Sequence, residues 1–238
     1  MSPEAPLALS FFDMEASCSG TIRSALTLLF EDRAARAERT AAEFERTGGG
    51  WTARVGDEVE VTLTAESQEV DLAGVAISVC SVEGRVGQTK LKGLGTAAET
   101  RTAPEWSDLD ALRAISAVFA PDLAVLAVAR RPRSAEGHGD ELVTAALLEA
   151  GEVRTPEDAR ISTVYDGGGR QHSSGIELWF PGEDYPRRLF GTVQAGTSLA
   201  LDGLFVHAGA FSWRMEGHSG PGLYELTVRR GDDEPVAA

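Results

Sequence analysis

Residues 204–230 read LFVHAGAFSWRMEGHSGPGLYELTVRR, and this stretch decides between two architectures. Its middle resembles the start of a nucleophile elbow, a sharp turn between a strand and a helix that presents a catalytic serine, here Ser219. The elbow needs glycine at its fifth position, where this chain has Pro221, and the residues that follow alternate as in a strand. We therefore predict an antiparallel hairpin with a tight turn within 216–222, and we do not expect Ser219 to be a nucleophile.

The two strands of this hairpin carry most of the candidate site residues. Period-two alternation places one histidine among large apolar side chains on a single face of the first strand. An aromatic wall with one titratable group suits an apolar ligand, although a lone histidine on such a face is more often a core residue. The candidate ligand-binding residues here are Phe205, Phe211, Trp213, Met215 and, from the second strand, Tyr224, with His207 as a candidate catalytic group.

Glu225 has two interpretations. Alternation separates it from Tyr224 and places it beside Leu223 and Thr227. If it faces a barrel interior, burial either raises its pKa or requires a hydrogen-bonded partner, and a carboxylic acid with a raised pKa is able to protonate an alkene or a carbonyl. On an outer face it is an ordinary solvated glutamate. Both interpretations stay open at the level of sequence.

The rest of the chain follows the same period. Alternating or continuous apolar runs cover 58–66, 70–86, 112–120, 123–131, 158–180 and 187–195, and Gly, Pro, Asp and Ser clusters separate them. Short strands joined by turn residues predict an all-β protein, a sandwich or a barrel. One segment, 31–46, is rich in the helix formers Ala, Arg and Glu, and a helix and a solvated strand both fit it. We expect 231–238 to be a disordered tail.

Composition excludes several kinds of partner and cofactor. The 238 residues carry a net charge of −15, which disfavours nucleic acid and anionic membranes as partners. No apolar run reaches the length of a transmembrane helix, and no signal peptide precedes the first strand, so we expect a cytoplasmic monomer or homodimer. The histidines lack metal-ligand spacing, and the glycine-rich 165–171 has no following helix, so we expect neither metal nor cofactor. Cys18 and Cys80 are expected to be free thiols, that of Cys80 buried in a strand.

Four stretches resemble the lipocalin-like superfamily of the hydroxyneurosporene synthases (carotenoid hydratases) and the AttH-type proteins. Residues 10–30 resemble the opening strand pair of that superfamily, and 212–230 resemble its terminal Gly-x-Gly-x-x-Glu strand, here Gly220, Gly222 and Glu225. Residues 80–100 resemble the strand that leads to a mid-chain site, and 158–180 resemble a later hairpin. The resemblance implies two consecutive lipocalin-like β-barrels or half-barrels packed together, which we place at 1–103 and 104–230.

The resemblance also implies an apolar cavity and, in the enzymes, cofactor-free chemistry on a hydrophobic substrate. One departure concerns the first half, where the family often has His-x-Trp-Gly after a Gly-x-Gly. Here the run is GLGTAAETRTAPEW (93–106), without the histidine. Trp106 follows later, and Glu99 and Arg101 are the nearest ionisable groups, so we add these three to the candidate ligand-binding residues.

Three functions fit these observations. The first is capture of a bulky hydrophobic molecule, an isoprenoid, polyene or polyketide, in an aromatic-lined cavity, with or without hydration, isomerisation or cyclisation assisted by Glu225 or His207. The second is a carrier or scavenger without catalysis. The third is a carbohydrate-binding or interaction sandwich, which requires Trp51, Trp106 or Trp179 exposed on a flat face.

Overall fold

The computed structural model describes residues 6–136, 140–201 and 203–229, and almost all of them form antiparallel β-structure. The first sheet contains β1 (Leu7–Asp13), β2 (Cys18–Arg23), β3 (Leu26–Glu31), β4 (Ala34–Glu38), β5 (Ala42–Thr47), β6 (Gly50–Val55), β7 (Val59–Ala65), β8 (Val70–Leu72), β9 (Val75–Val86) and β10 (Thr89–Thr100). The second contains β11 (Leu109–Ala120), β12 (Leu123–Pro132), β13 (Leu142–Glu149), β14 (Glu152–Arg154), β15 (Asp158–Tyr165), β16 (Gln171–Trp179), β17 (Arg187–Leu201), β18 (Leu204–Met215) and β19 (His218–Arg229). A 3-10 turn, Trp106–Asp108, lies between the sheets.

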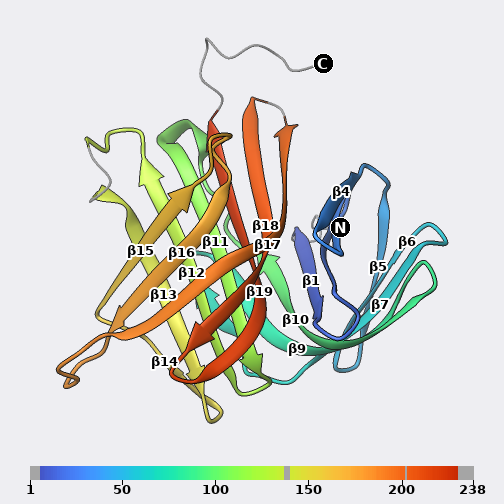
Figure 1. Cartoon of the computed structure of the whole chain (residues 1–238), viewed down its shortest axis with the longest axis horizontal. Helices are drawn as coiled ribbons and strands as arrows, with labels where there is room; N and C mark the ends of the chain where they lie inside the picture. Colours follow the sequence, from blue (N-terminus) through green and yellow to red (C-terminus); the bar gives the residue numbers. More distant parts are fainter. Residues whose placement is uncertain (1–5, 137–139, 202, 230–238) are drawn as a thin grey trace.

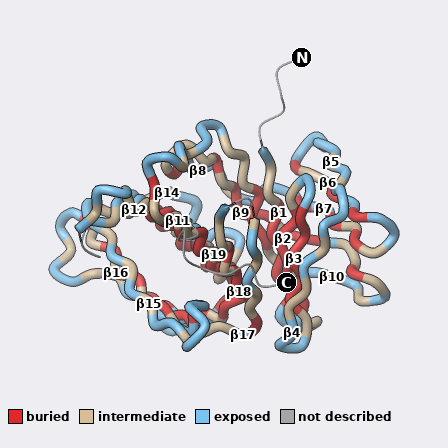
Figure 2. Tube along the Cα trace, turned by 90° about the horizontal axis from the view of Figure 1, so that it is seen from above, coloured by how far each residue is buried: buried red, intermediate tan, exposed pale blue. Residues whose placement is uncertain are grey.

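The two sheets share one topology. The first has the order β4-β3-β2-β1-β10-β9-β7-β6-β5, with β8 beside β9, and the second has β14-β13-β12-β11-β19-β18-β17-β16-β15. In each sheet, the first strand pairs with the last. The strands that follow the first lie on one side of this pair, and the strands that precede the last lie on the other side. Both sheets curl into half-barrels that lie side by side (Figures 1 and 2). The predicted all-β fold of two packed lipocalin-like half-barrels is confirmed.

Three apolar clusters divide the core. One fills the concave side of the first sheet, around Phe11 and Leu29. A second fills the concave side of the second sheet, around Trp213 and Tyr224. The third joins the sheets, because Phe30 and other residues of the first pack against Leu126, Ala210 and other residues of the second. Each strand of the second sheet therefore has one face toward its own interior and one toward the neighbouring half-barrel or solvent.

The segment 31–46 consists of strands, so the helical alternative is wrong there. Asp32 and Arg33 have φ angles of 46° and 69° and form a two-residue hairpin turn between β3 and β4. Phe44 of β5 packs, partly buried, against the apolar cluster of the first sheet. β4 pairs with β3 and β5 pairs with β6, and these pairings override the local helix propensity.

The predicted terminal hairpin is confirmed, with a shorter turn than expected. Glu216 and Gly217 alone form the turn, with φ angles of 49° and 87°, and β19 begins at His218. Ser219 is therefore a strand residue, paired with Arg214, and the strand continues to Arg229. The tail 231–238 lies outside the described residues.

Candidate functional site

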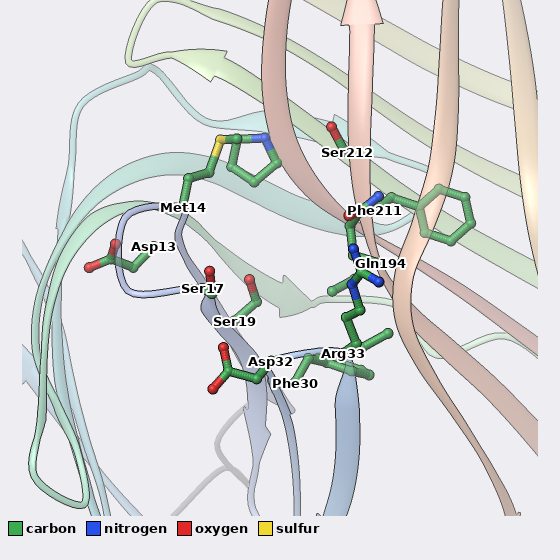
Figure 3. Close-up of a pocket in the computed structure, with 13 residues that line it drawn as sticks. Asp13, Met14, Ser17, Ser19, Phe30, Asp32, Arg33, Gln194, Phe211 and Ser212 are labelled. Atoms are coloured by element: carbon green, nitrogen blue, oxygen red, sulfur yellow. The ribbon is translucent and has the colours of Figure 1, made fainter.

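A cleft of about 410 Å³ lies between the two half-barrels. Turns of the first sheet form one wall, and β17, β18 and β19 form the other, so side chains from the two halves of the chain face one another across it (Figure 3). Its size is within the range of small-molecule sites. The lining residues are Asp13, Met14, Ser17, Ser19, Phe30, Asp32, Arg33, Gln194, Ala195, Ala210, Phe211, Ser212 and Pro221.

Irregular backbone opens this cleft. The pairing of β17 with β18 shifts register between Val193 and Ala195, and the bulge leaves Gln194 unpaired at the cleft wall. On the opposite wall, Ser17 in the β1–β2 connection and Asp32 and Arg33 in the β3–β4 turn have positive φ angles. Both connections are therefore tight turns, and neither extends across the cleft. The cleft is therefore an interruption of the apolar cluster that joins the sheets, to which Phe30, Ala195 and Ala210 also belong.

Asp13 has a structural role in the cleft wall. One carboxylate oxygen accepts a hydrogen bond from the Ala16 amide at 2.8 Å, and the other accepts one from the Lys92 amide at 2.7 Å. These bonds fix the β1–β2 turn against β10. The polar groups that remain for a ligand are the hydroxyls of Ser17, Ser19 and Ser212, the amide of Gln194, and the charges of Asp32 and Arg33.

Four of the predicted ligand-binding residues meet inside the second half-barrel. Phe211 stacks on Trp213 with ring centroids 5.3 Å apart and lies 5.5 Å from the ring of Tyr224, and Met215 belongs to the same cluster. Side-chain atoms of Trp213 cover Gly191 and Gly222, where a Cβ atom would overlap the indole. The glycine spacing of the terminal strand thus accommodates the Trp213 ring. Only Phe211 of this group also borders the cleft.

His207 and Phe205 lie toward the other end of β18. Their rings stack at 6.3 Å, and the Nδ1 atom of His207 is 2.7 Å from the hydroxyl of Ser198 on β17. They share the inward face of Phe211 and Trp213, as the alternation predicted, but both are only half-buried. Neither lines the cleft.

Glu225 lies on the opposite face of the second sheet from His207. It is paired with Ala114 and Ala208 and faces the first half-barrel, where its carboxylate forms an ion pair with Arg23 of β2 at 2.6 Å. The Glu225 side chain is 12% exposed. Its charge is thus compensated by a guanidinium across the junction, and the structure does not bring the two candidate catalytic groups together.

The remaining candidates lie near the connection between the sheets. Glu99 is 3.9 Å from Arg46, and Arg101 pairs with Glu69, while the Trp106 carbonyl accepts a hydrogen bond from Arg229. None of the three lines the cleft. The other tryptophans considered for a sugar-binding face, Trp51 and Trp179, are half-buried, as is Trp106.

Sequence reasoning missed two polar pairs inside the second half-barrel. Arg113 of β11 and Glu141 form an ion pair at 3.1 Å with side chains 10% and 8% exposed. The Tyr224 hydroxyl is 2.8 Å from that of Thr163. Arg113 interrupts the apolar face that Ala111 and Ile115 share, and this was the available signal. The turn residues of the cleft gave no such signal, because turns rich in Asp and Ser are ordinary.

Two observations bear on ion and membrane chemistry. Within residues 6–136, 140–201 and 203–229, no three His, Cys, Asp or Glu side chains are grouped as a metal would need. Over the same ranges, no helix is long and apolar enough to span a membrane.

Comparison with known proteins identifies the fold. No family model matches the sequence, and no curated protein matches it. Among solved structures, CghA matches with a TM-score of 0.63 at 9% identity, over 99% of this chain and 91% of that one. CghA with Sch210972 matches with a TM-score of 0.61 at 10% identity, over 98% and 90%. A putative AttH from Nitrosomonas europaea matches with a TM-score of 0.60 at 13% identity, over 93% and 91%. The predicted resemblance to the AttH-type lipocalin-like proteins is confirmed as a likeness of fold.

Proposed function

We propose that this protein binds a bulky, mostly apolar small molecule in the cleft between its half-barrels. The observation that carries the proposal is the cleft itself, about 410 Å³ in volume and built from both halves of the chain. Met14, Phe30 and Pro221 supply apolar contact, and the serine hydroxyls with Gln194 supply hydrogen bonds. Such a lining suits a hydrocarbon framework that carries a few oxygen atoms, as isoprenoids and polyketides do. One solved structure of the same fold is described as CghA with Sch210972, which supports small-molecule binding by this architecture.

Binding without chemistry is the form of this function that the geometry favours. Proton transfer needs a group within hydrogen-bond reach of the ligand. Of the two candidate catalytic groups, Glu225 is paired with Arg23 and His207 is on the other face of the sheet. Asp13, which does line the cleft, accepts two backbone hydrogen bonds. The second candidate is a cofactor-independent isomerase or cyclase that acts by holding one substrate conformer. Fixing the reacting geometry in an enclosed site can by itself supply much of the rate enhancement of such a reaction.

A cleft-blocking variant tests the binding site. Ser212 lines the cleft, and Thr192 is its paired neighbour on the same face of the sheet but does not line it. We expect Ser212→Trp to weaken the binding of Nile red, a neutral apolar dye, by at least about tenfold in a fluorescence titration, since the added ring occupies part of a site of ordinary ligand size. Thr192→Trp is the matched control and should bind the dye as the unaltered protein does. Equal loss in both variants, or in neither, would show that the dye does not use the cleft.

A further inference from the structure

A groove of about 550 Å³ crosses the outward face of the second half-barrel, over strands β15 to β18. Strand alternation defines this face, because Ile161, Ile176 and Leu189 pack toward the interior and the residues next to them along each strand point outward. β15 and β16 lie on the side of the molecule away from the first half-barrel (Figures 1 and 2), and the groove shares no lining residue with the cleft. Its outward-facing lining residues include Arg160, Ser162, Gly175, Arg188, Phe190 and Arg214.

An exposed aromatic ring stands beside an open floor in this groove. Phe190 of β17 is 54% exposed and is paired in register with Gly175 on one side and with Arg214 on the other. A Cβ atom placed on Gly175 would have only the Ser162 hydroxyl and the Leu189 carbonyl within 4 Å, so the Phe190 ring does not cover this glycine. The backbone at Gly175 is therefore open to a flat group that packs against Phe190.

Three guanidinium groups border this floor. Arg160 donates from Nε to Asp158 at 3.0 Å, and Arg188 donates from Nε to Glu177 at 2.8 Å. The hydrogen bonds of the described residues leave the terminal nitrogens of both arginines unused. Arg214 forms no ion pair with any residue that the structure describes. Guanidinium donors are thus available to a ligand without breaking either of the existing pairs.

The strand register brings two of these guanidiniums next to the open floor. Arg188 precedes Phe190 by two residues on β17, so it is the diagonal neighbour of both Gly175 and Arg214. Long side chains at diagonal positions are within reach of one another, and hence of one anionic group. Arg214 lies near the β18–β19 turn, whereas Leu204 and Arg229, which adjoin undescribed residues, form the pair at the other end of these strands.

We propose that this groove is a second binding site, independent of the cleft, for a small aromatic carboxylate. The ring of the ligand lies over Gly175 against Phe190, and its carboxylate accepts hydrogen bonds from Arg214 and from the terminal nitrogens of Arg188. Guanidinium is well suited to pair with a carboxylate, and a local group of arginines attracts an anion even to a protein of net charge −15. Contact with the exposed ring favours an aromatic acid over an acid that has no ring.

The test compares cinnamate with its neutral analogue cinnamamide in calorimetric titrations of the whole chain. We expect cinnamate to bind about fivefold more tightly and high salt to reduce the difference. Arg214→Gln should weaken cinnamate binding by about fivefold and leave cinnamamide binding unchanged, whereas Phe190→Ser should weaken both by about fivefold. A partly solvated ion pair and an aromatic contact each contribute about 1 kcal/mol, which corresponds to about fivefold in affinity.

Three control variants lie outside the groove. Arg133→Gln removes an exposed guanidinium, and Tyr185→Ser removes a ring that is 83% exposed. Ser19→Trp fills part of the cleft from the wall of the first sheet. All three should bind cinnamate as the unaltered protein does, and thermal unfolding of each variant verifies that it is folded.

Several results would overturn the proposal. They are the absence of cinnamate binding at millimolar concentration, equal affinities for cinnamate and cinnamamide, and cinnamate binding that is indifferent to Arg214→Gln or to Phe190→Ser. Loss of cinnamate binding in Ser19→Trp would place the acid in the cleft and overturn it as well. Because the groove and the cleft share no lining residue, none of these results bears on the binding of Nile red in the cleft.

Discussion

Single glycines control the largest side chain of the interior. Trp213 lies against Gly191 and Gly222, on the strands either side of β18, and a Cβ at Gly191 would lie 2.4 Å from its ring. A Cβ at Gly222 would lie 2.8 Å from the indole nitrogen and would also overlap the Ser116 carbonyl. The glycines of the terminal strand, noted in the sequence as part of a family pattern, thus have a packing explanation.

Gly222→Ala should therefore destabilise the protein strongly. We expect a loss of about 3 kcal/mol in the free energy of unfolding, measured by urea denaturation, because overpacking a tight site commonly costs about 1–3 kcal/mol and here the backbone is also displaced. Gly167→Ala is the control, since a Cβ there has no neighbour within 4 Å. A Gly222→Ala protein as stable as the Gly167→Ala protein would contradict this account of the Trp213 site.

The two cysteines are expected to be unreactive. Burial is the largest cause that raises the pKa of both Cys18 and Cys80, to about 12 in each case, and nearby carboxylates contribute. At pH 8 almost no thiolate forms, and the thiolate is the reactive species. A thiol-reactive aromatic disulfide should therefore label neither residue in the folded protein and both in urea. Labelling of the folded protein at the rate of a free thiol would refute this expectation.

At the scale of elements, a charge network lies at the end of the second half-barrel that carries the β18–β19 turn. Arg187 contacts Glu149, Glu183 and Glu216 at 3.0–3.2 Å, and Arg154 contacts the first two of these glutamates. Its arginines and glutamates come from the β13–β14 hairpin, the β16–β17 connection with the start of β17, and the β18–β19 turn. Within the network, the Arg154 guanidinium also covers the ring of Phe180, 4.2 Å from its centroid. Nothing in the local sequence of any one turn indicates the other two.

Acid should remove the contribution of this network. Arg154 and then Arg187 lower the pKa of Glu183 in the folded protein, so its stabilising effect is present above its unfolded pKa of about 4.3 and is lost as pH falls through the lowered folded value. We expect Glu183→Gln to be less stable than the unaltered protein at pH 7 and the difference to shrink near about pH 3 in urea denaturation.

A neighbouring glutamate provides the control for this pH effect. Glu152 is exposed at the same end and has no ion pair among residues 6–136, 140–201 and 203–229, so Glu152→Gln should match the unaltered protein at both pH values. A difference between Glu183→Gln and the unaltered protein that stays constant with pH would argue against an electrostatic origin.

At the scale of the whole molecule, the ion pair of Arg23 with Glu225 joins the two half-barrels at their junction. Arg23 comes from the first sheet and Glu225 from the second, and the surrounding contacts are apolar. Because Arg23 is one-third exposed, water screens part of the attraction. We expect a coupling energy of about 1 kcal/mol in a double-mutant cycle of Arg23→Gln and Glu225→Gln, measured by urea denaturation.

The comparison for this cycle is a pair within one sheet. Arg54 and Glu60 are 2.9 Å apart but nearly half exposed on both sides, so their coupling should be smaller. A coupling at Arg23–Glu225 no larger than this one would indicate that the ion pair adds little to the stability of the junction.

The sequence by itself determined the β architecture, the terminal hairpin and the face of each of its side chains. These follow from period-two alternation and turn residues, which act over a few residues along the chain. The strand character of 31–46 could not be read from composition, because hairpin pairing of β4 with β3 and of β5 with β6 outweighs the helix propensity of Ala, Arg and Glu. The repeated strand order of the two sheets could not be predicted either, because two sheets can share a topology without similarity between their amino-acid sequences.

Only the tertiary structure decided which faces meet. It placed Glu225 against Arg23, 202 positions away, and separated it from His207. It also created the cleft, whose walls are turns and a bulge from opposite ends of the chain, and the interior pairs of Arg113 with Glu141 and of Tyr224 with Thr163. A strand pattern tells which side chains share a face, but what lies opposite that face depends on how the sheet curls and on which sheet packs against it.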